Sequence, residues 1–235
     1  ESGRAIYDAG VMIAVDGSLV AKGERFHMSD VEVVTADVDL SRSRIGQINS
    51  SQRYYEEHDF DTEAIVKVTI SERSDRPKLR VQPLHQPWEE SEHLEHEEAL
   101  RAIAIGLRDW LRKTHTGGFA LSLSGGADSA LVASAVYTAV ILELWELVAR
   151  TEKGAECVLP AHLSQFIHKD KRDEFKQAEN TVDQHQLVMD TASTIMANML
   201  TTAYQASANS GPVTRTAAQK VAQSFGAKFL NLSVA

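Results

Sequence analysis

Apolar residues come in short, strand-like runs over the first 70 positions of the chain. The runs at 11–15 and 19–21 flank Asp16-Gly17, a dipeptide typical of a two-residue hairpin turn because both positions accept positive φ. Further strands are predicted at 31–40 and 64–70. No strong helical pattern interrupts this part, so we predict a β-rich unit.

The pattern changes after residue 70. Charged residues and three prolines between positions 71 and 92 predict an extended linker. From His93 to Leu111 the apolar residues recur every three or four positions, which predicts a helix that ends before Gly117-Gly118. The sequence is therefore predicted to divide into residues 1–70, a linker over 71–92 and a second domain over 93–235.

Strand-like and helix-like segments alternate in this second domain. A strand from Phe119 precedes a helix over 128–150, which is predicted to bury Leu131, Val132, Ala135, Val136 and Val140. Residues 151–189 are polar and predict one or two surface helices. The run 194–204 is an inner strand or a helix running into one, a helix with a stripe of Val213, Ala217, Val221 and Phe225 follows, and 229–234 is another strand. This alternation predicts an α/β fold with a doubly wound parallel sheet, in which ligands bind at the carboxyl ends of the strands.

The strongest candidate for chemistry is Ser124-Gly-Gly-Ala-Asp-Ser129, between the predicted strand and helix. A glycine-rich turn that opens a helix presents backbone N–H groups and the positive end of the helix dipole to an anion. The two serines would add donors, and Asp128 could hold a metal ion that bridges phosphate oxygens. The alternative is a tight strand-to-helix turn whose glycines serve only geometry.

This turn is neither of the two common nucleotide loops, because no lysine follows the glycines and the Gly-x-Gly-x-x-Gly spacing is absent. It resembles the pyrophosphate-binding loop of the ATP pyrophosphatase superfamily, Ser-Gly-Gly-x-Asp-Ser. That resemblance implies cleavage of ATP between its α- and β-phosphates. The motif does not choose among the superfamily's members, which include synthetases for NAD, GMP, asparagine and argininosuccinate and several tRNA-modifying enzymes.

The first 40 residues carry a second resemblance. Ile6-Tyr-Asp-Ala-Gly10, Ala14-Val-Asp-Gly17, Val20-Ala-Lys-Gly23 and the run from Asp30 to Leu40 are similar to the C-terminal end of a nitrilase-type amidase domain. The family's catalytic glutamate, lysine and cysteine all precede this hairpin, so none is expected here, and Cys157 is not that nucleophile. An unrelated β-hairpin domain is the alternative for residues 1–40.

The stretch from Leu200 to Ala222, with Asn209-Ser, Thr214-Arg and an alanine-rich helix, resembles the segment after the second strand of glutamine-dependent NAD synthetases. Together with the amidase-like tail before the loop, it implies that residues 1–70 end a glutaminase domain and that 93–235 begin an ATP-dependent synthetase domain. In that family deamido-NAD is adenylated by ATP with release of pyrophosphate, and ammonia derived from glutamine then displaces AMP. The resemblance also implies a homo-oligomer.

The residues expected to bind ATP follow from these resemblances. They are Ser122, Leu123, Ser124, Gly125, Gly126, Ala127, Asp128, Ser129, Thr202 and Arg215, with Asp128 as the Mg²⁺ ligand. Tyr204 lies beside Thr202 and could line the adenosine pocket or belong to the core, and Arg215 could instead cap a helix face. No residue is assigned as a catalytic acid or base.

Composition excludes several function classes. A net charge of −9 without a dominant basic patch argues against binding to nucleic acid. A lone cysteine, Cys157, excludes an internal disulfide and is typical of the reducing cytoplasm, where we expect the protein. No apolar run is expected to span a bilayer, and no signal peptide opens the sequence, so no membrane association is predicted.

Two other interpretations stay open on the sequence alone. The chain could belong to another ATP pyrophosphatase, such as a GMP-synthetase-like or tRNA-thiolating enzyme, or it could be a non-catalytic nucleotide-binding module. The closing run 229–234 reads as a buried strand without its following helix, so we expect the sequence to be part of a longer protein.

Overall fold

A computed structural model describes residues 5–38, 86–151, 156–177, 183–207 and 211–233. They fall into two compact units. One unit takes in Glu1–Ala9, Arg25–Val31 and everything from Pro87 onward, and the other takes in Gly10–Glu24 and Glu32–Gln86. The predicted boundaries at 70 and 92 stay predictions, because most of that region lies outside the described residues.

The predicted hairpin is confirmed in the second of these units. Strands β1 (Met12–Val15) and β2 (Ser18–Lys22) pair antiparallel, and Asp16 and Gly17 both take positive φ in the turn. The strand predicted at 31–40 is wrong for its described part, since residues 31–38 form no strand. Val31 and Val33 are exposed, and Glu32 instead accepts a hydrogen bond from the backbone N–H of Glu24 at 2.7 Å. The predicted strand at 64–70 lies outside the described residues.

Two N-terminal segments belong to the same unit as the predicted second domain. Arg25 is paired with Asp8 and Glu98, at 2.8 and 2.7 Å, and its guanidinium lies 5.6 Å from the ring centre of Trp88 in η2 (Pro87–Glu90). On the other side Arg101 lies 4.5 Å from the same ring. Such cation–ring contacts, added to the ion pairs, fix the segment around Arg25 against the start of the helical region.

The helix predicted from His93 is α2 (Leu94–Thr114). Its C-terminal residue in the left-handed conformation is His115 rather than a glycine, and the His115 N–H donates to the carbonyl of Leu111. Gly118 has a different role. Its φ is +115°, and a Cβ atom there would lie inside van der Waals contact of the Met199 carbonyl oxygen, so only glycine lets β3 begin this close to the end of α6.

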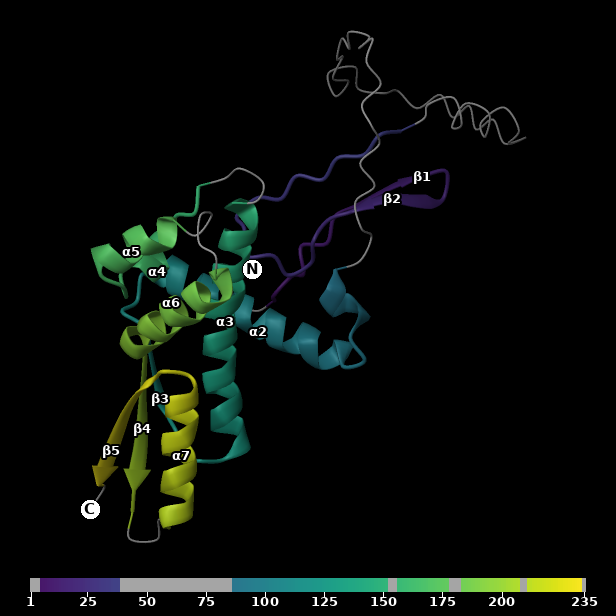
Figure 1. Ribbon diagram of the computed structural model, residues 1–235. Helices are drawn as coiled ribbons and strands as arrows, with labels where there is room; N and C mark the ends of the chain where they lie inside the picture. The colour runs from purple at the N-terminus through teal and green to yellow at the C-terminus, as the bar shows by residue number, and fades with distance from the viewer. Residues whose placement is uncertain (1–4, 39–85, 152–155, 178–182, 208–210, 234–235) are drawn as a thin grey trace, which may run out of the picture. The chain divides into compact units, whose positions relative to one another are not determined.

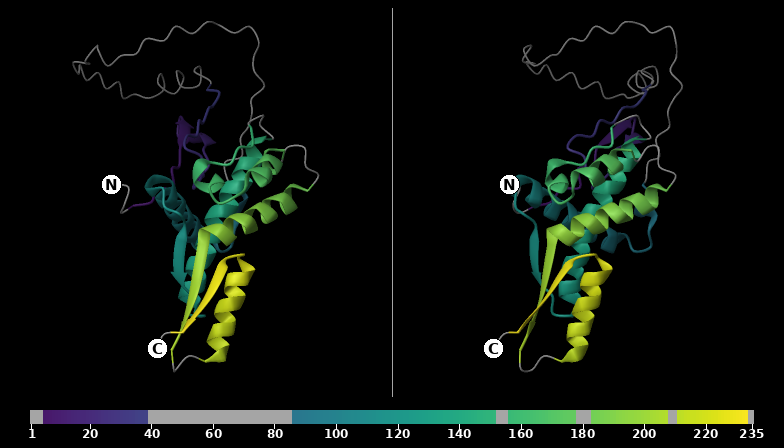
Figure 2. Two further views of the ribbon diagram at one scale, coloured as in Figure 1. Left: turned by 90° about the vertical axis from the view of Figure 1, so that its left-hand side faces the viewer. Right: turned by 60° about the vertical axis from the view of Figure 1, so that its left-hand side comes forward.

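Three parallel strands form the sheet of this unit in the order β3 (Phe119–Ser122), β4 (Leu200–Ala206), β5 (Lys228–Ser233). Helix α6 (Gln184–Met199) runs directly into β4, which confirms the second of the two forms predicted for 194–204. Helix α7 (Pro212–Ser224) packs on β4 and β5, and the strands and α7 run side by side in Figures 1 and 2. The α/β class with a parallel sheet is therefore confirmed.

The core is organised around α3 (Ala127–Thr151), which contacts α2, α6 and α7. Ala135, Val136 and Val140 are buried as predicted, whereas Leu131 and Val132 are 55% and 45% exposed. Those two predictions are wrong, because in the first turns of α3 the covered face is the one that carries Ala133, which is fully buried. The buried residues of α3 lie between Ala133 and Thr151.

Helix α3 also corrects a second expectation. By length and composition it could cross a membrane, which the sequence had not led us to expect of any segment. Half of its most apolar stretch is buried inside the unit, against α2 and α6. That is the packing of a core helix, since its apolar side chains are covered by protein.

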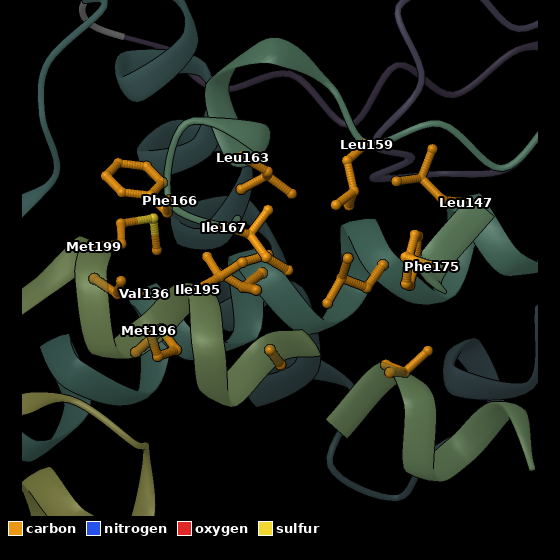
Figure 3. Close-up of a cluster of buried hydrophobic side chains, with 14 of the residues drawn as sticks. Val136, Leu147, Leu159, Leu163, Phe166, Ile167, Phe175, Ile195, Met196 and Met199 are labelled. Atoms are coloured by element: carbon orange, nitrogen blue, oxygen red, sulfur yellow. The ribbon is translucent and has the colours of Figure 1, made fainter. Parts of the chain in front are cut away.

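The polar region 151–189 contributes to the core, which corrects the prediction of surface helices. It forms α4 (Ala161–Ser164) and α5 (Lys169–Lys176) before α6 begins. Its apolar residues pack against Val136, Ile195, Met196 and Met199, as Figure 3 shows; they are Leu159, Leu163, Phe166, Ile167 and Phe175. These residues are spread over turns and short helices, so they form no periodic stripe in the sequence from which their burial could be predicted.

Helix α7 forms where a helix was predicted, and its predicted stripe is partly covered, because Val221 and Phe225 pack against the core and Val213 does not. Its N-cap is Gly211, without a side-chain cap, and Pro212 occupies the first turn, where its fixed φ suits a helix. Val213 is 79% exposed, and Ala218 and Ala222 are the residues fully buried against the sheet. Small alanine side chains allow the helix to lie close to β4 and β5.

Candidate phosphate-binding site

The loop Ser124–Ser129 lies at the carboxyl end of β3 and opens α3, where the parallel-sheet fold predicts a ligand. The Leu123 N–H donates to the Ala203 carbonyl at 2.8 Å, so the ladder with β4 continues to the residue before the loop. Ser124, Gly126 and Asp128 are exposed. In Figure 1 the loop and the N-terminus of α7 lie at the same end of the sheet, beside the arrowheads of β4 and β5.

The loop is closed by its own hydrogen bonds. The Ser129 hydroxyl donates to the Gly126 carbonyl at 3.1 Å, and it accepts from the N–H of Ser124 at 3.3 Å. Its one proton is then used, so the Ser124 hydroxyl, 3.1 Å away, donates to Ser129 and accepts from the Gly126 N–H at 3.2 Å. The two serines therefore hold the turn in shape as well as offering polar atoms at its surface.

Unpaired backbone donors follow directly after the glycines. The first intrahelical bond of α3 runs from the Ala130 N–H to the Gly126 carbonyl at 3.2 Å. The N–H groups of Ala127, Asp128 and Ser129 consequently have no acceptor within the helix. With the helix dipole behind them, these groups form an anion site of the kind that binds phosphate.

Gly125 brings a second helix to this site. Its φ is +84°, and a Cβ atom on it would overlap the carbonyl oxygen of Thr214 in the first turn of α7. The Thr214 hydroxyl lies 2.7 Å from the phenol oxygen of Tyr204. The structure thus brings together the loop, the first turn of α7 and the end of β4, which are far apart in sequence.

The predicted ATP-binding residues divide into two groups. Ser124, Gly125, Gly126, Ala127, Asp128 and Ser129 form one continuous surface at the loop, and exposed Ser122 and Arg215 lie nearby on β3 and in the first turn of α7. The side chains of Leu123 and Thr202 do not reach that surface. Leu123 packs in the core with Tyr204, Ala218 and Ala222, and the buried Thr202 hydroxyl donates to the Lys228 carbonyl at 2.9 Å.

Comparison with known proteins decides the family. The family model described as NAD synthase matches residues 99–232, which include the loop, the three strands and α7. The chain belongs to the NAD synthase family. This family match favours the NAD synthetase resemblance over the GMP-synthetase-like and tRNA-thiolating alternatives.

Relatives of this NAD synthase family chain are similar along nearly its whole length. Glutamine-dependent NAD(+) synthetases of Mus musculus and Homo sapiens are 32% and 30% identical to it, over 98% of this chain and 29% and 30% of theirs. The crystal structure of a glutamine-dependent NAD(+) synthetase from Cytophaga hutchinsonii superposes with a TM-score of 0.59 at 27% identity, covering 98% of this chain and 28% of that one. The chain spans less than a third of the length of the relatives it matches.

Asp128 carries the one carboxylate of the loop and is its candidate metal ligand. It is exposed in the first turn of α3, beside the free N–H groups. The described part of the chain holds no group of three or more His, Cys, Asp or Glu side chains arranged to bind a metal. A single carboxylate fits Mg²⁺, which keeps several waters and is commonly held by one or two carboxylates together with substrate phosphates.

Sequence reasoning missed a buried polar network on the later turns of α3. Glu143 of α3 and His162 of α4 are buried, and the His162 Nε2 lies 2.9 Å from a carboxylate oxygen of Glu143. Arg108 of α2 contacts the other oxygen at 3.2 Å and donates to the Met28 carbonyl at 2.6 Å. Burial opposes the charge on Arg108, but Glu143 and Asp109 outweigh it and raise the pKa of the guanidinium. The feature of the sequence that could have indicated this network is the position of Glu143 within the apolar run from Val140 to Leu147.

Cys157 is a packed residue. It is 3% exposed within the main core cluster, and burial raises the pKa of its thiol to about 11. A neutral, covered thiol is a poor nucleophile, because the thiolate is the reactive form. This agrees with the sequence interpretation that Cys157 is not a catalytic nucleophile.

Proposed function

We propose that the protein carrying this chain is a glutamine-dependent NAD synthetase, and that residues 93–235 hold its site for the phosphates of ATP. The observation that supports this most directly is the self-closed loop Ser124–Ser129 at the carboxyl end of β3, in a chain of the NAD synthase family. The names of the relatives support the use of glutamine.

In the proposed reaction the nicotinate carboxylate of deamido-NAD attacks the α-phosphorus of ATP. A carboxylate-oxygen-to-phosphorus bond forms, and the bond from that phosphorus to the bridging oxygen breaks, releasing pyrophosphate. Ammonia then attacks the adenylated carbonyl carbon, a carbon–nitrogen bond forms, and AMP leaves with the former carboxylate oxygen. The ammonia nitrogen loses one proton to give the neutral amide.

The chain's contribution to the first step is electrostatic. Negative charge grows on the bridging oxygen and the β-phosphate as pyrophosphate departs, and donors already aimed at that charge lower the barrier. The N–H groups at the start of α3 would serve in this way, while the hydroxyls of Ser124 and Ser129, whose protons are used within the loop, would hold it in shape. When bound, Mg²⁺ held by Asp128 would neutralise part of the phosphate charge.

Arg215 is proposed to contact the nucleotide from the other side. It is exposed in the first turn of α7, and its guanidinium makes no hydrogen bond or ion pair with the described residues. Thr202 and the side chain of Leu123 are not included in the proposed contact surface, because they are buried. Ser122, exposed at the end of β3, stays within it.

The remaining parts of the proposal come from resemblance. Residues 1–70 are proposed to end a nitrilase-type glutaminase domain that supplies ammonia. A homo-oligomeric state and a cytoplasmic location also stay proposals, and the covered single cysteine is compatible with the latter.

Product analysis tests the proposal. The protein at its full natural length, given ATP, Mg²⁺, deamido-NAD and ammonium, is expected to form NAD, AMP and pyrophosphate in equal amounts. Glutamine should replace ammonium in that full-length protein. Formation of ADP and phosphate would reject cleavage between the α- and β-phosphates and with it the proposed function.

A further inference from the structure

The phenol group of Tyr204 is joined to the first turn of α7 by a directed pair of hydrogen bonds. Its oxygen lies 2.7 Å from the Thr214 hydroxyl, which donates to the Gly211 carbonyl at 3.0 Å. Thr214 has one hydroxyl proton, so it must accept from Tyr204. The order of donation is therefore Tyr204 to Thr214 to Gly211, and it ends at the N-cap of α7.

The same threonine touches the phosphate-binding loop through its backbone. The Thr214 carbonyl oxygen lies so close to the Cα atom of Gly125 that no side chain fits between them. A shift of the α7 first turn toward the loop would clash with Gly125, and a shift away would open a gap there. The position of Thr214 therefore sets one wall of the loop.

We propose that Tyr204 is a positioning residue for the phosphate-binding loop, acting through Thr214 on Gly125. The inference rests on the proposed function, because it takes Ser124–Ser129 as the site for the ATP phosphates. Tyr204 need not touch the nucleotide. Its hydroxyl keeps the N-terminal turn of α7 against Gly125, so that the loop before α3 holds a fixed geometry.

The ring and the hydroxyl of Tyr204 have separable roles. The side chain is 4% exposed, and the ring packs with Leu123, Ala218 and Ala222 between sheet and helix. Phenylalanine would fill that space equally well. The hydroxyl adds only the bond to Thr214, which makes Tyr204→Phe a clean removal of the positioning contact.

The test measures nucleotide affinity and fold stability together in the full-length protein. In Tyr204→Phe the dissociation constant for Mg²⁺–ATP, measured without deamido-NAD, is expected to rise about three- to tenfold, the range for one lost hydrogen bond. The KM for ATP should rise with it, while kcat and the melting temperature change little. Thr214→Val should match this effect, Thr214→Ser should keep wild-type affinity, and the double change Tyr204→Phe with Thr214→Val should add nothing further.

Tyr137→Phe is the matched control. Tyr137 is partly buried on α3, and its hydroxyl contacts the Met189 sulfur at 3.7 Å rather than any residue of the loop or the first turn of α7. This variant should bind Mg²⁺–ATP as the wild type does. Affinity losses of equal size in Tyr137→Phe and Tyr204→Phe would show that the loss comes from a general change in packing, and they would overturn the proposal.

Failure of the inference and failure of the proposed function give different results. Wild-type affinity in Tyr204→Phe, in a protein that still forms AMP and pyrophosphate, would overturn the positioning role alone. A wild-type protein that forms ADP would reject the proposed function. Wild-type affinity in Thr214→Ser together with weakened affinity in Thr214→Val would support the hydroxyl contact, because serine keeps the hydroxyl and valine keeps the shape of threonine without it.

Discussion

Glu143 and His162 form a buried pair, with 2.9 Å between the carboxylate oxygen and the ring Nε2, and their side chains are 3% and 5% exposed. The second oxygen of Glu143 holds Arg108, which in turn binds the Met28 carbonyl. The pair therefore joins α2, α3, α4 and the segment 25–31. Because the carboxylate of Glu143 holds four segments together, the stability of the fold is predicted to depend strongly on this residue.

Glu143→Ala is predicted to lower the free energy of unfolding by about 3–5 kcal/mol, because it leaves the buried Arg108 with less negative charge beside it. Urea unfolding followed by circular dichroism measures the change. Glu174→Ala is the control, since Glu174 pairs with Lys171 on the exposed face of α5 and should matter little. Equal stability of both variants would show that the buried network is not a structural anchor.

The free energy of unfolding is predicted to depend on pH in the acid range because of Asp109. Burial would raise the pKa of this carboxyl, but hydrogen bonds from Lys113 and Arg108 outweigh burial and lower it below its ordinary value of 3.8. A lowered folded-state pKa contributes stability above that ordinary value, and the contribution is lost as pH falls through the folded-state pKa. The wild type should exceed Asp109→Asn in unfolding free energy at pH 6, and the difference should shrink below about pH 4. A difference that is the same at pH 3 and pH 6 would contradict the shift.

Cys157 is predicted to be protected from alkylation in the folded protein. Its thiol is covered by protein. Its pKa is raised from 9.0 to about 11, so at pH 8 the thiolate is about a hundredfold scarcer than for a thiol with the ordinary pKa. Reaction with a thiol reagent should be slow in buffer and complete at once in guanidinium chloride. Rapid reaction under native conditions would show that the core around Cys157 opens readily.

Local sequence features predicted the local structure well. Asp16-Gly17 marked the hairpin, the glycines at 125 and 126 marked a turn at the start of a helix, and the apolar spacing after His93 marked α2. Each of these depends on residues within a few positions of one another. Family membership was likewise indicated by contiguous motifs.

Features that depend on distant partners were not predicted. Thr202 is buried and its hydroxyl bonds to the Lys228 carbonyl of β5, and Leu131 is exposed although Ala133, two residues later, is buried. The contact of Gly125 with Thr214 joins a loop residue to a residue of α7, and no pattern near either residue indicates it. These properties follow from how the elements pack, which hydrophobic spacing does not specify.

The two loop glycines are predicted to differ in their tolerance of a methyl group. Gly125→Ala should lose most Mg²⁺–ATP binding, because alanine is strained at φ +84° and its Cβ would overlap the Thr214 carbonyl. Gly126→Ala is the matched control. A Cβ at Gly126 would meet only the Ser124 hydroxyl at 3.4 Å, and φ there is not in the left-handed region. Titration with Mg²⁺–ATP measures both, and equal losses would contradict a specific role for the Gly125 contact.

Asp128 is the proposed metal ligand. Asp128→Asn keeps the size and exposure of the side chain but removes its charge, so it should weaken ATP binding in the presence of Mg²⁺ and slow pyrophosphate release in the full-length protein. ATP binding in EDTA should change less, since the N–H groups at the start of α3 remain. Asp173→Asn, an exposed aspartate on α5, controls for the loss of one negative charge and should behave as the wild type. Unchanged pyrophosphate release by Asp128→Asn across a Mg²⁺ titration would reject Asp128 as the ligand while leaving the loop's backbone donors in place.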